Sequence, residues 1–176
     1  MDRASSVAGQ LTPLGAVAGV YTAYIWKNVT FTFWFGAATL ESCATMEEGC
    51  RKCAAEHPER LSSINVMIPG GRNMPDAAAR AEIVRIVREY GNSTAALAVL
   101  IPGSGFWASA LRSVTVALSM VRPQGMPMQI FGDTAQLSDW LAPIHSERTG
   151  VPLTAAELLS VIQELERALA VTVAAA

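Results

Sequence analysis

The sequence predicts an α/β protein with a mixed, mostly parallel sheet of four to five strands, flanking helices and an N-terminal β-hairpin. From residue 21 onward, short β-rich runs alternate with helical patterns, which is typical of a parallel sheet with helices packed on it. Two of these runs end alike, as Val-Met-Ile-Pro-Gly at 66–70 and Val-Leu-Ile-Pro-Gly at 99–103. A chain of 176 residues fits one domain that builds its own core.

Composition narrows the class of protein. Hydrophobic residues make up 51% and charged residues 16%, against a usual charged share of about 25%, which excludes disorder and predicts an apolar surface that meets a partner. A net charge of −2 gives no support to nucleic-acid binding. Residues 4–26 carry no charge but are too polar and too broken to span a membrane, so no stable membrane insertion is expected.

The start of the chain is a poor signal-peptide n-region, and three cysteines are an odd number for a disulfide framework. We therefore expect reduced thiols and a cytoplasmic protein. Residues 1–18 are rich in Ala, Gly, Ser and Thr and are interpreted as a flexible tail.

The predicted hairpin comes next. In residues 29–35 every second residue is large and apolar, with Thr30, Thr32 and Trp34 between them, as in a strand with two different faces. Residues 21–26 form a second β-rich run, and Lys27-Asn28 suits a two-residue turn between the two.

The other elements follow from periodicity and from start and stop signals. Pro75 suits a first helical position, while Asp133 and Thr154 each precede a Gln or Glu by three residues, which indicates capping boxes. The expected order is helix 40–57, strand 61–68, helix 75–90, strand 95–101, helix 106–121, strand 128–131, helix 133–141 and helix 154–169. The run 95–101 is almost wholly apolar, as in a strand covered on both faces.

Cys43, Cys50, Cys53 and His57 look at first like a zinc set. The helix that carries them rises about 21 Å from the first to the last, at 1.5 Å per residue, so the four cannot meet at one ion. The Cys50–Cys53 spacing also occurs in redox pairs, but those lie at a helix start. We interpret the cysteines as core residues and expect no metal and no cofactor.

The two Pro-Gly loops form a candidate ligand site, because open α/β sheets bind ligands beyond the carboxyl ends of their strands. The glycine pattern matches neither a P-loop nor a dinucleotide fingerprint. A tight turn that requires positive φ is the simpler interpretation, and an anion or small-ligand site is the alternative. The candidate residues are Gly70, Gly71, Gly103, Ser104, Gly105 and Arg112.

No catalytic constellation emerges. Ser104 does not lie in a nucleophile-elbow pattern, and nothing places His57 or His145 beside it, since His145 falls in a predicted loop at 143–150. We predict that the protein is not an enzyme.

The third predicted helix, residues 106–121, has almost no polar face. Such a helix must be packed against other parts of the protein, or against a partner, on most of its sides. The candidates to cover this helix are the N-terminal tail, the last helix and a second subunit. The last helix is amphipathic, so it could dock in cis or pair with a copy of itself. A homodimer is the leading expectation. The candidate interface residues are Phe106, Trp107, Leu111, Val114, Leu118, Leu158, Ile162 and Leu165.

Three segments resemble bacterial STAS-like domains: Met74-Pro75-Asp76-Ala77-Ala78-Ala79-Arg80, then Gly103-Ser104-Gly105-Phe106 with Arg112, and Ala135 through Trp140-Leu141. The likeness spans roughly residues 20–142. STAS-like domains resemble the anti-sigma-factor antagonists and are grouped loosely with CRAL-TRIO-like lipid-binding folds. The resemblance implies a mixed sheet flanked by helices and a regulatory role without catalysis. The signalling members carry a phosphorylatable hydroxyl in a loop that matches residues 69–76, which have none, so no functional residue is carried over.

These observations predict a bacterial, regulatory or scaffold protein that acts by protein–protein contact. Its expected parts are a tail at 1–18, a STAS-like domain at 19–142, and a linker with a C-terminal helix at 143–176. A small-ligand or lipid-binding domain that uses the Pro-Gly loops is the first alternative, and an uncharacterised enzyme is the second.

Overall fold

The computed structural model describes residues 11–68, 74–104, 106–120 and 122–174, except for the side chains of residues 106, 107, 114, 117–119 and 170–174. In this part of the chain the strands are β1 (Thr12–Val17), β2 (Tyr21–Trp26), β3 (Val29–Trp34), β4 (Leu61–Met67), β5 (Thr94–Leu100) and β6 (Met128–Phe131). The helices are α1 (Leu40–Glu56), α2 (Ala77–Tyr90), α3 (Phe106–Ser119), α4 (Thr134–Thr149) and α5 (Ala155–Ala174).

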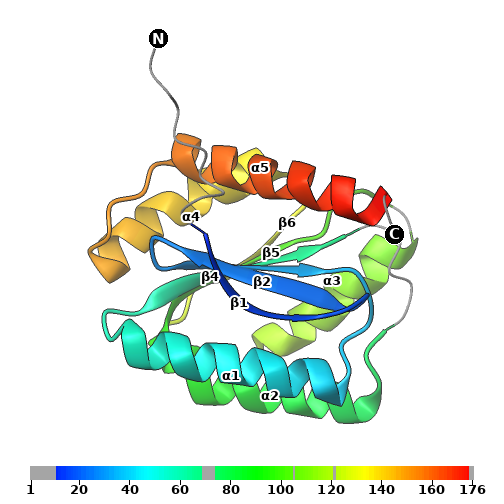
Figure 1. The fold of residues 1–176 in the computed structure, drawn as a ribbon. Helices are drawn as coiled ribbons and strands as arrows, with labels where there is room; N and C mark the ends of the chain where they lie inside the picture. Colours follow the sequence, from blue (N-terminus) through cyan, green and yellow to red (C-terminus); the bar gives the residue numbers. More distant parts are fainter. Residues whose placement is uncertain (1–10, 69–73, 105, 121, 175–176) are drawn as a thin grey trace.

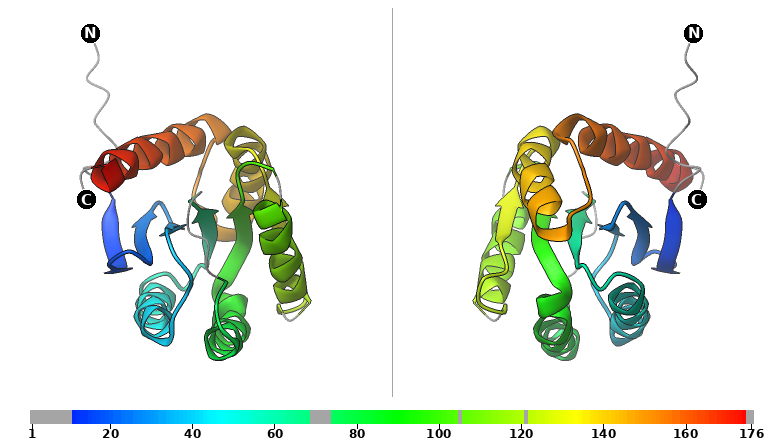
Figure 2. Two further views of the ribbon diagram at one scale, coloured as in Figure 1. Left: turned by 90° about the vertical axis from the view of Figure 1, so that its right-hand side faces the viewer. Right: turned by 90° about the vertical axis from the view of Figure 1, so that its left-hand side faces the viewer.

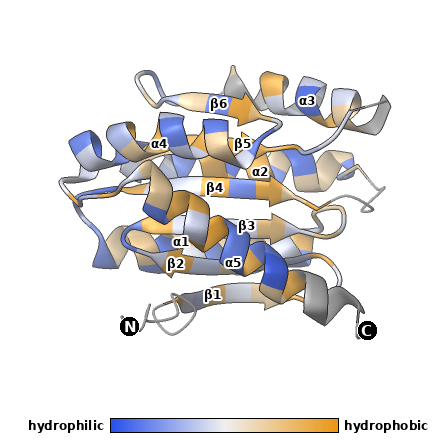
Figure 3. Ribbon diagram, turned by 90° about the horizontal axis from the view of Figure 1, so that it is seen from above, coloured by the Kyte–Doolittle hydropathy of each residue, from blue (hydrophilic) through white to orange (hydrophobic). Residues whose placement is uncertain are grey.

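The strands form a single sheet in chain order, β1 to β6, with α1 and α2 on one face and α4 and α5 on the other (Figures 1 and 2). The third helix flanks the sheet at the β5–β6 side (Figure 2). Seen from the α5 side and coloured by hydropathy, apolar segments of the central strands lie beneath the helices, and β4 also carries a hydrophilic segment (Figure 3). Among the described helices none is both long and apolar enough to cross a membrane.

The α/β class, the flanking helices and the N-terminal hairpin are confirmed. The sheet differs in detail, because the described residues supply six strands instead of four to five. The β1–β2 and β2–β3 pairs are antiparallel, whereas β3 to β6 are parallel. Lys27 and Asn28 both have positive φ, at 46° and 58°, as a tight hairpin turn requires.

The additional strand is β1, so the prediction of a flexible tail was wrong for residues 12–17. The composition of residues 12–17 did not indicate a strand, since small residues have weak strand propensity. Pro13 is tolerated because β1 is an edge strand, and the ladder shifts register between Pro13 and Gly15. Gly15 allows β1 to pack closely on α1, since a Cβ there would lie 3.1 Å from Thr45 Cγ2.

The fourth helix also differs from the prediction. It continues through Pro143 to Thr149, where a helix end at 141 and a linker from 143 were expected, so the predicted domain boundary falls inside α4. Buried side chains on both sides of Pro143 hold the helix, among them Leu141 and His145. It ends at Gly150, whose φ of 73° suits a left-handed C-cap.

The residues predicted to begin the helices are largely confirmed. Asp133 accepts from the backbone N–H of Gln136, and Thr154 and Glu157 form the expected reciprocal box. In α2 the side chain of Asp76 is the N-cap, which leaves Pro75 before the helix instead of at its first position.

Candidate functional site

The two faces of the sheet are packed differently. The alternation in β3 points Val29, Phe31 and Phe33 at α4 and α5, where they belong to a large continuous core. The same alternation points Thr30, Thr32 and Trp34 at α1 and α2. This second face therefore receives fewer large apolar side chains from its central strands.

On the second face the buried residues fall into two small clusters. One surrounds Tyr21, Trp34 and Cys43 between β2, β3, α1 and α2. The other surrounds Val99 and Ile101 under α3. Only Met67, which is partly buried, packs against both clusters in the described residues.

A cavity of about 420 Å³ lies on this face, between the sheet and the helices α1, α2 and α3. This volume falls within the range of roughly 300–1,000 Å³ typical of small-molecule sites. Most of its described lining is apolar. Representative lining residues are Leu14, Met46, Cys50, Cys53, Ala54, Leu61, Met67, Ile83, Val87, Leu97, Val99, Leu111 and Met128.

Four polar side chains of the lining come from the two central strands of the sheet, β3 and β4. Thr30 pairs in register with Ser63, and Thr32 pairs with Asn65, so the four form a two-by-two group on β3 and β4. We call Thr30, Thr32, Ser63 and Asn65 the central polar patch. Central strands of a parallel sheet are normally apolar on both faces, so this patch is unusual for its position.

Tyr21 lines the cavity next to β1. Its ring is buried and stacks on Trp34, with the ring centroids 5.1 Å apart. The Tyr21 hydroxyl makes no hydrogen bond of standard geometry within the described residues, although the side chain of Thr45 lies beside it. Burial, as the largest cause, raises the pKa of Tyr21 to about 12, so the phenol is neutral at ordinary pH.

The cysteines agree with their interpretation as core residues. Cys43 and Cys53 are buried and Cys50 is half-buried. Cys50 and Cys53 line the cavity. Burial, the largest cause in each case, raises the pKa of Cys50 to about 12 and that of Cys53 to about 11, so both thiols stay protonated. Among the described residues no group of three side chains is placed to hold a metal ion.

Arg80 is the only charged side chain among the described residues that line the cavity. It lies in the first turn of α2, is exposed, and donates from Nη1 to the carbonyl of Pro75 at 2.6 Å. The described lining holds no carboxylate and no imidazole, so it offers hydrogen bonds and apolar surface without an acid–base pair.

The predicted ligand loop lies elsewhere. Gly103 has a φ of 83°, as the tight-turn interpretation requires. Arg112 does reach this loop, where its Nη2 donates to the carbonyls of Ile101 and Gly103 at 3.0 and 2.9 Å. Gly103, Ser104 and Arg112 do not line the cavity. Gly70, Gly71 and Gly105 lie outside the described residues.

The predicted interface residues divide into three groups. Leu158, Ile162 and Leu165 are buried in the chain's own core, so α5 docks in cis and these residues are not free to meet a second copy. Leu111 is half-buried and lines the cavity. The side chains of Phe106, Trp107, Val114 and Leu118 lie outside the description.

The structure assigns the two histidines to different places. His57 caps the end of α1 with its backbone and lies near Glu59. His145 lies inside α4 and contacts Ser62, not Ser104, so the prediction that placed it in a loop was wrong. Both His145 and Ser62 are completely buried, which keeps this hydroxyl–imidazole pair from any substrate in this structure.

Sequence reasoning did not identify the cavity. The signal that it left unused was the repeated placing of Thr, Ser and Asn on one face of two adjacent strands, at alternate positions in 29–34 and 61–67. Comparisons with family models, with curated proteins and with solved structures found no match.

Proposed function

We propose that this protein is a non-catalytic binding module whose cavity between the sheet and α1–α2 holds a small, mainly apolar molecule. The observation that carries the proposal is the cavity itself: about 420 Å³ with a largely apolar lining on the less densely packed face of the sheet. Protein interiors are normally close-packed, and an empty cavity lowers the stability of the fold. We therefore expect a cavity of this size to be maintained because it binds a ligand.

The proposal modifies the ligand-binding alternative that the sequence raised. The binding region moves from the Pro-Gly loops to the inside of the domain, while the expectation of binding without catalysis stays. The resemblance to STAS-like domains also stays a prediction, and the proposal does not depend on it.

A neutral fluorescent probe tests the proposal. N-phenyl-1-naphthylamine should bind the purified protein with a blue shift and saturation at one equivalent. Ala54→Phe, on the cavity side of α1, should abolish the signal because the new ring fills the space. Ala55→Phe is the matched control, since Ala55 is exposed on the same helix. Probe binding that survives Ala54→Phe, or that both variants lose equally, contradicts the proposal.

Self-association through α3 is a second candidate function, in line with the expected homodimer. Two large apolar side chains are exposed here, Val116 in α3 at 54% and Met120, which directly follows α3, at 84%. Light scattering coupled to size exclusion should find a dimer that the Val116→Glu, Met120→Glu double variant converts to monomer. Leu40→Glu is the control, because Leu40 is 58% exposed on α1. A wild-type monomer at high protein concentration would exclude this second function.

A further inference from the structure

The central polar patch lies on β3 and β4, the two middle strands of the sheet, where the sheet lines the cavity. Along β4 the same face carries Leu61 at the strand start and Met67 at its end, and both line the cavity. Further polar lining residues come from other elements: Thr45, Ser93, Thr94 and Thr115. A bound molecule whose polar group meets the patch would therefore have apolar side chains beside it in both directions along β4.

The hydrogen bonds within the patch leave donors available. Trp34 Nε1 donates to Asn65 Oδ1 at 3.0 Å, so the main acceptor of the patch already has a partner. Thr30 Oγ1 donates to the carbonyl of Ser62, and Asn65 Nδ2 donates weakly to Ser63 Oγ at 3.4 Å. Neither bond uses the hydroxyl proton of Ser63. Thr32, which is 7% exposed, makes no side-chain hydrogen bond within the described residues.

The charges around the patch further restrict which ligand can bind. Arg80 is the one charged side chain of the described lining; it is exposed, and its Nη1 donates a hydrogen bond to a backbone carbonyl. An ionised group at the patch would lose its water without gaining an opposite charge, which is costly. Burial of a neutral acceptor oxygen costs far less free energy, because the hydroxyls of Thr32 and Ser63 and the amide N–H of Asn65 can donate hydrogen bonds to it.

We propose that the patch selects a neutral, largely apolar molecule with a carbonyl or similar acceptor oxygen in its interior, held by Thr32 and Ser63. This inference rests on the proposed function and adds the chemical class of the ligand.

Three probes with nearly the same skeleton test the selection: pentylbenzene, which lacks oxygen, 1-phenylpentan-1-one, which carries a ketone, and 5-phenylpentanoate, which is charged at pH 8. Each displaces N-phenyl-1-naphthylamine from wild type, from the Thr32→Val, Ser63→Ala double variant, and from Thr22→Val. Thr22 is the control because it pairs with Phe33 on the other face and does not line the cavity.

In the double variant the affinity for the ketone should fall about tenfold, equivalent to two lost hydrogen bonds, while that for pentylbenzene changes less than twofold. Thr22→Val should change neither. Equal changes for ketone and hydrocarbon, or tightest binding of the carboxylate to wild type, would overturn the assignment of ligand class alone. Failure of every probe, the fluorescent one included, would overturn the proposed function as well.

Discussion

The imidazole of His145 lies 3.0 Å from the hydroxyl of Ser62, measured from Nδ1 to Oγ, and both side chains are completely buried. Thr149 Oγ1 lies 3.4 Å from Nε2 of the same ring. The contact joins α4 to β4 at the start of the parallel part of the sheet. Burial is the largest cause that lowers the pKa of His145, and the nearby charge of Lys27 lowers it further, while a hydrogen bond with the Lys27 backbone raises it.

This environment predicts a loss of stability in mild acid. The unfolded chain protonates His145 at about pH 6.5, whereas the folded protein resists protonation until lower pH. The free energy of unfolding should therefore be unaffected by His145 above about pH 7 and should fall below it. Urea unfolding between pH 5 and 8 measures the slope. His145→Gln should lower stability at pH 8 by roughly 1–3 kcal/mol and flatten the slope below pH 6.5. A slope that His145→Gln leaves unchanged would refute this.

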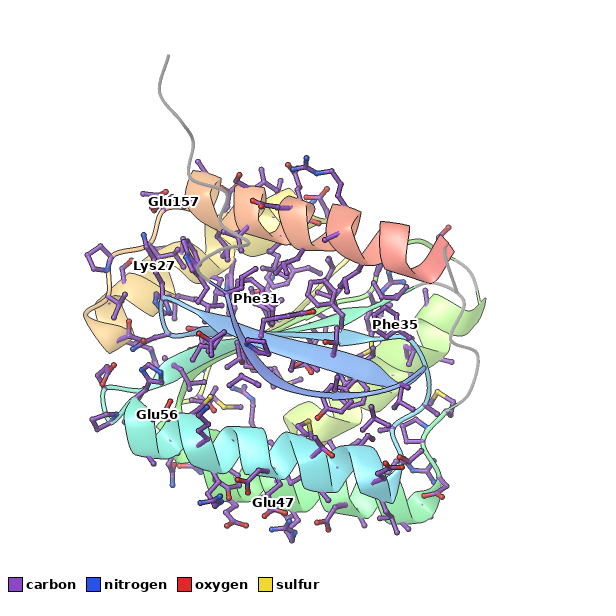
Figure 4. The ribbon with its side chains drawn as sticks, viewed as in Figure 1. Lys27, Phe31, Phe35, Glu47, Glu56 and Glu157 are labelled. Carbon is purple, nitrogen blue, oxygen red and sulfur yellow. The ribbon has the colours of Figure 1, made fainter. Side chains whose placement is uncertain are left out.

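Lys27 and Glu157 form an ion pair of 2.8 Å between the β2–β3 turn and the start of α5 (Figure 4). The hydrogen bond from Lys27 is the largest cause that lowers the pKa of Glu157 to about 2. Its contribution to stability is present above about pH 4.3 and is lost as the pH falls towards 2. Because both side chains are more than a third exposed, a double-mutant cycle with Lys27→Met and Glu157→Gln should give a coupling energy below about 1 kcal/mol. Gln at 157 keeps the capping box, so the cycle isolates the charge. A coupling of several kcal/mol would show that solvent screening is much weaker here.

The cavity predicts that filling it stabilises the fold. Ala54→Leu adds apolar volume to the lining of the cavity and should raise the free energy of unfolding by about 0.5–2 kcal/mol. Ala55→Leu, on the exposed side of α1, should change it by less than about 0.5 kcal/mol. Denaturant titration of both variants measures the difference. Clear destabilisation by Ala54→Leu would mean that the space is already filled.

The cysteines should be unreactive in the folded protein. With pKa values of about 12 for Cys50 and 11 for Cys53, their thiolate fraction at pH 8 is at least about a hundredfold below that of a free thiol with a pKa near 8.5. Iodoacetamide at pH 8 should label neither position in native protein, and both after unfolding in guanidinium chloride, as read by peptide mass spectrometry. Labelling of native Cys50 at the rate of a free thiol would revive a redox role for the Cys50–Cys53 pair.

Local patterns were sufficient for most of the fold. The hairpin turn at Lys27-Asn28, the N-cap at Asp133 and the box at Thr154 act through neighbours within a few residues, so the sequence alone identifies them. Local reasoning failed at β1 and at Pro143. In both cases contacts with distant residues, such as Thr45 beside Gly15 and Ser62 beside His145, overrode weak or contrary propensity.

The candidate site shows the same division. Alternation along β3 and β4 determined that Thr30, Thr32, Ser63 and Asn65 share a face, because side-chain direction in a strand depends only on the backbone period. That this face borders a cavity, that Leu158 and Ile162 fill the opposite core, and that Arg112 is bound to its own loop were decided by how the helices dock on the sheet. How the helices dock depends on many contacts between residues far apart in the chain, so local sequence patterns cannot predict it.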